Sequence, residues 1–216
     1  ASLTNTSGDI ITGVGALLVS AAGGVSNEEG VIQAAGDVTL TAVSLDNENA
    51  GKIISNAGTL NIQNIGGQAM TLIANNKGAL QAENNIGLVA TNLNNGAGAL
   101  INAVNGGLTI SAGGPTATAK INNAKGTLQS LNDLGLTVAG LDNDGGSIIE
   151  RSGTRTLLLT NGSGSAVADF SDAGGILQAA GDLKIDTTSL DGASRLVAGR
   201  NLDVTVSSDL SSDTLF

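Results

Sequence analysis

The chain has 216 residues, 19 Asp and Glu against nine Lys and Arg, a formal net charge of −10, two Phe, and no Trp, Tyr, His or Cys. The negative charge repels phosphates and anionic lipid headgroups, so nucleic-acid and membrane-surface partners are disfavoured. Without His or Cys, a Ser-His-Asp triad, a thiol nucleophile and a zinc site of the usual type are excluded.

The hydropathy pattern and the first residues show neither a membrane-spanning segment nor a signal peptide. No apolar run approaches the ~20 residues that a membrane-spanning helix needs, so we expect no membrane insertion. Residues 1–4 lack the basic region and apolar core of a signal peptide. We interpret the chain as a segment of a longer protein.

Glycine corners recur along the chain and define a repeat. The steps between them alternate between about 20 and about 28 residues, which gives a super-repeat of about 48. From the first, the corners are Gly30, Gly51, Gly78, Gly98, Gly126, Gly146, Gly175 and, with serine in place of glycine, Ser194.

Each unit carries three short apolar segments in fixed positions. Two residues after each corner come Ile32, Ile53, Leu80, Leu100, Leu128, Ile148, Leu177 and Leu196. Alternating pairs follow at Val38/Leu40, Leu60/Ile62, Ile86/Leu88, Leu108/Ile110, Leu136/Val138, Leu157/Leu159, Leu183/Ile185 and Leu202/Val204. Before the next corner come Val25, Leu45, Ile73, Leu93, Ile121, Leu141, Phe170 and Leu190.

Alternation at period two is typical of a strand with one buried face, so each unit predicts a coil of three strands. One coil cannot bury its inner face alone, but stacked coils cover one another. We predict an all-β solenoid of about nine or ten coils, roughly 45 Å long. Residues 1–206 form one repeat domain and residues 207–216 a poorly patterned tail. An antiparallel β-sandwich has no reason to repeat one corner every 48 residues.

A polar residue precedes each corner by three positions, except Asn47, which is displaced by one. Stacked side-chain amides can bond along the axis as a ladder, and glycine at the corner is expected to relieve the strain of a positive φ. Metal or substrate ligation is the less favoured reading. The ladder residues are Asn27, Asn47, Asn75, Asn95, Asn123, Asn143, Asp172 and Asp191.

The long units contain roughly eight additional residues after the alternating pair, at residues 21–24, 65–69, 112–116 and 161–165. Insertions in alternate coils should form a ridge on one side of the rod, and such a face could bind a receptor or another copy of the protein. A structural bulge is favoured because the insertions are small and poor in charge. The candidate binding residues are Gly66, Gly67, Gln68, Gly113, Gly114, Pro115, Thr116, Gly162, Ser163 and Gly164.

Because His and Cys are absent, carboxylates are the only plausible acid and base. Some parallel β-helices act on acidic polysaccharides, so a groove with paired Asp or Glu is the less favoured, enzymatic alternative. The closest pairs are Asp142/Asp144 and Glu28/Glu29, and both lie in turns that the repeat explains. The calcium-binding nonapeptide and the P-loop are absent. We therefore expect no catalytic residue, no cofactor and no metal.

The units resemble the repeats of filamentous-haemagglutinin-type exoproteins. The resemblance lies in the pattern GxLxAxxxLxLxAxxLxNxxG and covers about residues 13–206. It is clearest in residues 78–98, and residues 35–40 carry a variant.

This resemblance implies a right-handed parallel β-helix in the rod of a protein that two-partner secretion exports to the surface of a Gram-negative bacterium. Two branches share such rods: adhesins, and contact-dependent inhibition proteins that deliver a toxin. The implied partners are an outer-membrane secretion protein and a receptor on a host or neighbouring cell. The repeat alone does not choose between the branches.

Overall fold

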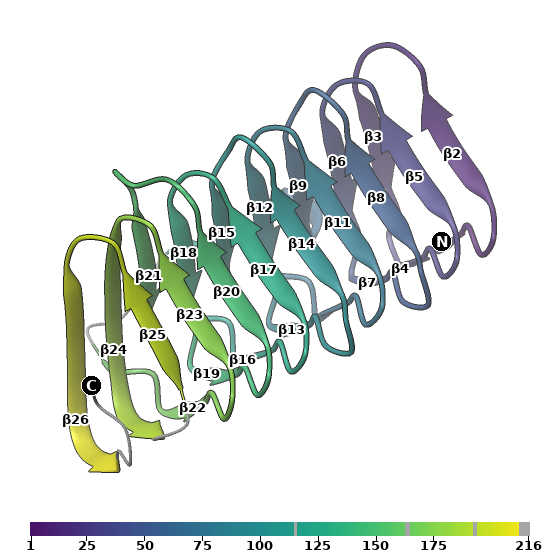
Figure 1. Cartoon of the computed structure of the whole chain (residues 1–216). Helices are drawn as coiled ribbons and strands as arrows, with labels where there is room; N and C mark the ends of the chain where they lie inside the picture. Colours follow the sequence, from purple (N-terminus) through teal and green to yellow (C-terminus); the bar gives the residue numbers. More distant parts are fainter. Residues whose placement is uncertain (115, 163–164, 192–193, 212–216) are drawn as a thin grey trace.

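The computed structural model is a right-handed parallel β-helix of about nine turns (Figure 1). It describes residues 1–114, 116–162, 165–191 and 194–211, with side chains left out for Asp191 and 209–211. Within these ranges the one helix is the short 3-10 turn η1 (Ile65–Gly67), and none is long and apolar enough to cross a bilayer.

Three parallel sheets run along the rod, and each coil contributes one strand to each sheet in turn. Sheet A contains β1 (Leu3–Thr4), β4 (Gly24–Ser26), β7 (Ser44–Asp46), β10 (Leu72–Ala74), β13 (Asn92–Asn94), β16 (Lys120–Asn122), β19 (Gly140–Asp142) and β22 (Asp169–Ser171). Sheet B contains β2 (Asp9–Thr12), β5 (Val31–Ala34), β8 (Lys52–Ser55), β11 (Ala79–Ala82), β14 (Leu100–Ala103), β17 (Thr127–Ser130), β20 (Ser147–Glu150), β23 (Ile176–Ala179) and β25 (Arg195–Ala198). Sheet C contains β3 (Leu17–Ser20), β6 (Val38–Thr41), β9 (Leu60–Gln63), β12 (Ile86–Val89), β15 (Leu108–Ser111), β18 (Leu134–Thr137), β21 (Thr156–Thr160), β24 (Asp182–Asp191) and β26 (Leu202–Ser211).

The core consists of aliphatic ladders, as the period-two pattern predicts. Leu60, Ile86 and Leu108 occupy one register position in successive coils of sheet C, and each is almost completely buried. Burial of one such side chain contributes about 1.5–3 kcal/mol, and each coil covers the apolar side chains of its neighbour. Stacking therefore replaces the aromatic centre that a compact domain of this size would use.

Two register predictions are wrong. Leu80 pairs with Ile101, so the buried residue of β14 is Ile101 and Leu100 faces outward. The expected corner at Gly98 lies instead at Ala99, because the turn after Asn95 holds one more residue than predicted. In β18 the pair equivalent to Leu108/Ile110 is Leu134/Leu136, two residues earlier than expected.

Corner glycines are required for a different reason from the one expected. The left-handed backbone belongs to the residue before the corner, as in Glu29 (φ 56°), Lys77 (φ 60°) and Lys125 (φ 59°). The corner itself packs against the preceding coil: a Cβ built on Gly126 would lie 1.7 Å from the carbonyl oxygen of Asn95. Glycine therefore permits close stacking of coils at the corner between sheets A and B.

Candidate functional site

The predicted ridge corresponds to three loops at one corner of the rod. They connect β9 to β10, β15 to β16 and β21 to β22, so each leaves sheet C and enters sheet A. The intervening coils make the same connection with two residues, 90–91 and 138–139. The loops therefore recur in alternate coils along one edge, about 10 Å apart.

The pairing of each long coil with its short neighbours gives the length of each insertion. In the short coils Ala90 and Val138 directly follow sheet C, and parallel bridges pair them with Met70 and Thr118 of neighbouring coils. The extra residues are therefore 64–69, 112–117 and 161–166, which is six residues in each case rather than roughly eight. The expected insertion at residues 21–24 is wrong, since only residues 21–23 lie between β3 and β4.

The first loop is closed by its own hydrogen bonds. The Asn64 side chain accepts from the backbone N–H of Ile65 at 2.8 Å, and the Asn64 N–H donates to the carbonyl of Gln68 at 2.8 Å. Gly66 (φ 71°) and Gly67 (φ 75°) adopt the left-handed backbone that this tight path requires. Ile65 is 56% exposed and adds an apolar contact point to an otherwise polar loop.

The predicted ridge residues lie on these loops wherever they are described. Gly66, Gly67, Gln68, Gly114, Thr116 and Gly162 are exposed, and Gly113 is half-buried. Pro115, Ser163 and Gly164 lie outside the described residues. Neighbouring loops approach each other, because a Cβ on Gly113 would lie 3.9 Å from the carbonyl oxygen of Gly67.

The candidate catalytic carboxylates support turns. Asp142 accepts from the N–H of Asp144 at 3.1 Å, and Asp144 accepts from the N–H of Ala173 at 2.8 Å. Glu28 and Glu29 accept single hydrogen bonds from side chains of adjacent coils. In the described part of the chain no three acidic side chains form a group that could hold a metal ion.

The predicted amide ladder is confirmed from Asn27 to Asp172, and the side chain of Asp191, the last predicted rung, lies outside the described residues. Each buried Asn donates from Nδ2 to the Oδ1 of the next rung at 2.6–2.8 Å, starting one coil before the first predicted rung. Nδ2 also donates to backbone carbonyls, which satisfies its second proton. The rungs are Asn5, Asn27, Asn47, Asn75, Asn95, Asn123, Asn143 and Asp172.

Asp172 is the rung with unusual electrostatics. Desolvation by burial raises the pKa of its carboxyl from 3.8 to about 7, although hydrogen bonds from Asn143 and Ser194 lower the pKa in part and the charge of Asp144 raises it. Its Oδ2 is buried and accepts no hydrogen bond from the described residues. This oxygen takes the place that Nδ2 fills in the other rungs, so a proton on it would restore a donor.

Sequence reasoning missed Glu150, a fully buried acid at the end of β20. Its register neighbours Ser130 and Ala179 are small, and the repeat predicts a small residue here. The carboxylate accepts from the N–H of Ser152 at 2.5 Å and of Gly181 at 3.1 Å. Glu150 therefore ties the turn between sheets B and C to the next coil.

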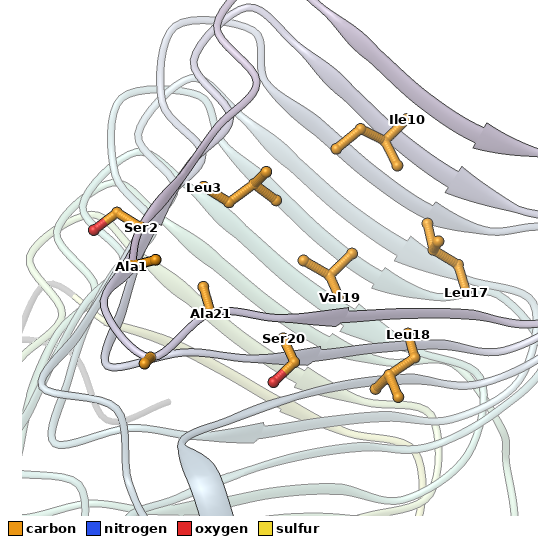
Figure 2. Close-up of a pocket in the computed structure, with 10 residues that line it drawn as sticks. Ala1, Ser2, Leu3, Ile10, Leu17, Leu18, Val19, Ser20 and Ala21 are labelled. Atoms are coloured by element: carbon orange, nitrogen blue, oxygen red, sulfur yellow. The ribbon is translucent and has the colours of Figure 1, made fainter.

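Described residues also line hollows outside the ridge. At the N-terminal end, Leu3, Ile10, Leu17 and Val19 of the first coil line a hollow that is the start of the aliphatic core (Figure 2). A second hollow on sheet C is lined by polar groups including Asn61, Thr109, Asn132, Asp133 and Arg155. The Arg155 guanidinium lies 3.9 Å from Asp133, and both are exposed.

A family model described as the haemagglutinin repeat matches residues 1–29, 12–72, 68–114, 103–163 and 153–215. These overlapping matches cover nearly the entire chain and coincide with the stacked coils. No curated protein and no solved structure shows significant similarity.

Proposed function

This chain belongs to the haemagglutinin-repeat family, and on that premise we propose that it is a non-enzymatic rod segment of a bacterial surface protein that mediates adhesion or contact-dependent inhibition. The family itself is of a structural, adhesin-like type, secreted and associated with surfaces. The finer assignment includes export by an outer-membrane secretion partner of a Gram-negative cell and a receptor on a host or neighbouring cell.

The observation that carries the proposal is the uninterrupted stack of coils. Aliphatic ladders and the amide ladder continue from coil to coil, so each additional coil extends the rod by one inter-strand spacing of about 4.8 Å. A spacer needs this property, because its length scales with repeat number while its surface chemistry can vary.

Removing one super-repeat tests the spacer role. Deletion of residues 79–126 joins Gly78 to Thr127. Because Thr127 occupies the register position of Ala79 two coils further on, the shortened rod keeps its register. We expect small-angle scattering of the isolated chain to show an elongated particle that shortens by about 10 Å. In a surface-displayed protein that carries this segment, adhesion or inhibition should persist. A compact wild-type particle, or complete loss of activity in a folded variant, would contradict the proposal.

The second candidate is a binding module formed by the ridge loops. It is supported by their recurrence at one corner and by the proximity of Gly113 to Gly67. Beads coated with the chain should then capture target cells, and removal of residues 64–69, 112–117 and 161–166 together should abolish capture. Equal capture by the loop-deleted rod would exclude this candidate and leave the spacer role intact.

A further inference from the structure

The outer face of sheet B carries a symmetric arrangement of side chains. Its nine strands lie side by side along one side of the rod (Figure 1). Two of the four positions in each strand point outward, so the face carries two parallel columns of side chains. We call this surface the B face and define it by those two columns.

The first column reads the same from either end. It is centred on Asn102, with Gln81 and Gln129 as flanking amides, and isoleucines and glutamines then alternate outward to an aliphatic residue at each end. In register order the column is Ile11, Gln33, Ile54, Gln81, Asn102, Gln129, Ile149, Gln178 and Val197.

The second column is centred on Leu100, which lies on the same strand as Asn102. Val31 and Ile176 are equidistant from Leu100, and Asp9 and Arg195 stand at opposite ends with opposite charges. The column is Asp9, Val31, Lys52, Ala79, Leu100, Thr127, Ser147, Ile176 and Arg195. Between its two ends the B face carries one charged residue, Lys52, in a chain of net charge −10.

The amides of the B face have no hydrogen-bond partner among the described residues. The side chains of Gln33, Gln81, Asn102, Gln129 and Gln178 form no hydrogen bond with any residue that the structure describes, and the Oδ1 of Asn102 is buried without a donor. The amide ladder inside the rod, by contrast, is bonded at every rung. The B face therefore presents glutamine amides without partners among the described residues, beside aliphatic side chains that are half-buried or, at Ile11, exposed.

We propose that two copies of this chain associate through their B faces as antiparallel rods related by a two-fold axis at Asn102. An axis along the strand direction reverses the rod and keeps each column opposite itself. Asn102 then faces its own copy, Ile54 faces Ile149, and Asp9 faces Arg195 of the other copy. In the first column amides face amides and aliphatic side chains face aliphatic side chains. In the second column the charged ends face opposite charges, and Lys52 faces Ser147.

Asn102 also fixes the register of the pair. A slip of two coils would still place glutamine against glutamine, but it would place Asn102 against Ile54 or Ile149. A buried amide against an aliphatic side chain is disfavoured, in the way that one polar residue sets the register of a coiled coil. The footprint of about 38 Å by 13 Å per copy lies near the lower limit of specific interfaces, so we expect a weak dimer.

Sedimentation velocity of the full chain tests the association, up to a concentration of about 1 mM, where even a millimolar Kd leaves dimer detectable. We expect the mass to rise from the monomer value of 21.1 kDa towards twice that value. Ile54→Asp and Ile149→Lys should each remain monomeric, since either places an unpaired charge against isoleucine. An equimolar mixture of the two should regain the dimer, because residue 54 of one copy faces residue 149 of the other.

The controls separate this surface from others. Thr109→Asp adds the same charge to the outer face of sheet C and should leave the dimer unchanged. Asn102→Cys should link to its own copy through a short bismaleimide, whereas Thr109→Cys should not. A monomeric wild-type chain, a dimer that survives Ile54→Asp in a folded variant, or failure of the mixture to recover would each overturn the proposal.

Discussion

Asn143 donates from Nδ2 to the Oδ1 of Asp172 across 2.6 Å, so the last rung that the structure describes in the amide ladder is a carboxyl group. Each asparagine both donates and accepts, and an ionised aspartate can only accept. The last rung therefore combines the geometry of the ladder with a group whose charge depends on pH.

Asp172→Asn should remove a pH dependence of stability. The folded state holds the proton up to a pKa of about 7, while the unfolded chain releases it near 3.8. The unfolded state then binds fewer protons between those values, so the free energy of unfolding falls as pH rises from about 4 to about 7. Asp172→Asn should be more stable than wild type by about 2–4 kcal/mol at pH 8 and similar to it at pH 4.

Chemical denaturation at both pH values measures this difference. Asp169→Asn is the matched control, because the Asp169 carboxylate is exposed and forms a surface ion pair with Lys120, which contributes little to stability. Equal stabilisation by both variants, or a wild-type stability that does not fall over this range, would contradict the role assigned to Asp172.

An interior rung should be costly to remove. Asn95 accepts from Asn75 and donates to Asn123, both at 2.8 Å, and all three are fully buried. Asn95→Ala leaves one donor and one acceptor without partners and opens a small cavity, so we expect a loss of about 2–5 kcal/mol. Asn61→Ala, on the exposed face of sheet C, should change stability by less than about 0.5 kcal/mol. Thermal unfolding of the two variants provides the comparison.

The sequence predicts the three-stranded coil because the same side-chain types return at the same register positions, as Leu60 and Ile86 do. The prediction of strand register fails where a turn changes length without changing its composition. Gly98 stands where a corner glycine is expected, yet the added residue moves the corner to Ala99 and buries Ile101 in place of Leu100. Composition alone carries no signal for such a one-residue shift.

The ladder and the ridge were predictable for the same reason, since Asn143 and the glycine-rich insertions recur with the repeat. Glu150 was not, because it occupies a position where the repeat has Ala or Ser and its partners are backbone N–H groups. The raised pKa of Asp172 depends on burial, which the residue type does not indicate.

Substitution of two glycines by alanine should have opposite effects. Gly126→Ala places a Cβ in contact with the Asn95 carbonyl of the preceding coil, where the backbone of both coils must move, so we expect a loss of more than about 3 kcal/mol. Gly135 faces outward in β18, with no atom within 4 Å of a Cβ built there. Gly135→Ala should be neutral or stabilising by up to about 1 kcal/mol, because alanine loses less backbone entropy on folding. Urea denaturation distinguishes the two, and similar effects would refute the stacking argument.

Removing one ridge loop should leave the rod folded. In the preceding coil, Thr41 is followed directly by Ala42. The backbone N–H of Ala42 and that of Met70 each donate to the next coil, and the two acceptors occupy equivalent register positions. Joining Gln63 to Met70 by deletion of residues 64–69 therefore converts a long coil into a short one. A shorter loop also costs less closure entropy, so we expect the melting temperature to stay within a few degrees of wild type. Deleting only residues 66–67 keeps four loop residues but removes the two glycines whose left-handed backbone closes the turn, so it should destabilise the rod more than the longer deletion does. If the six-residue deletion unfolds the chain, the loops are part of the structural repeat rather than additions to it.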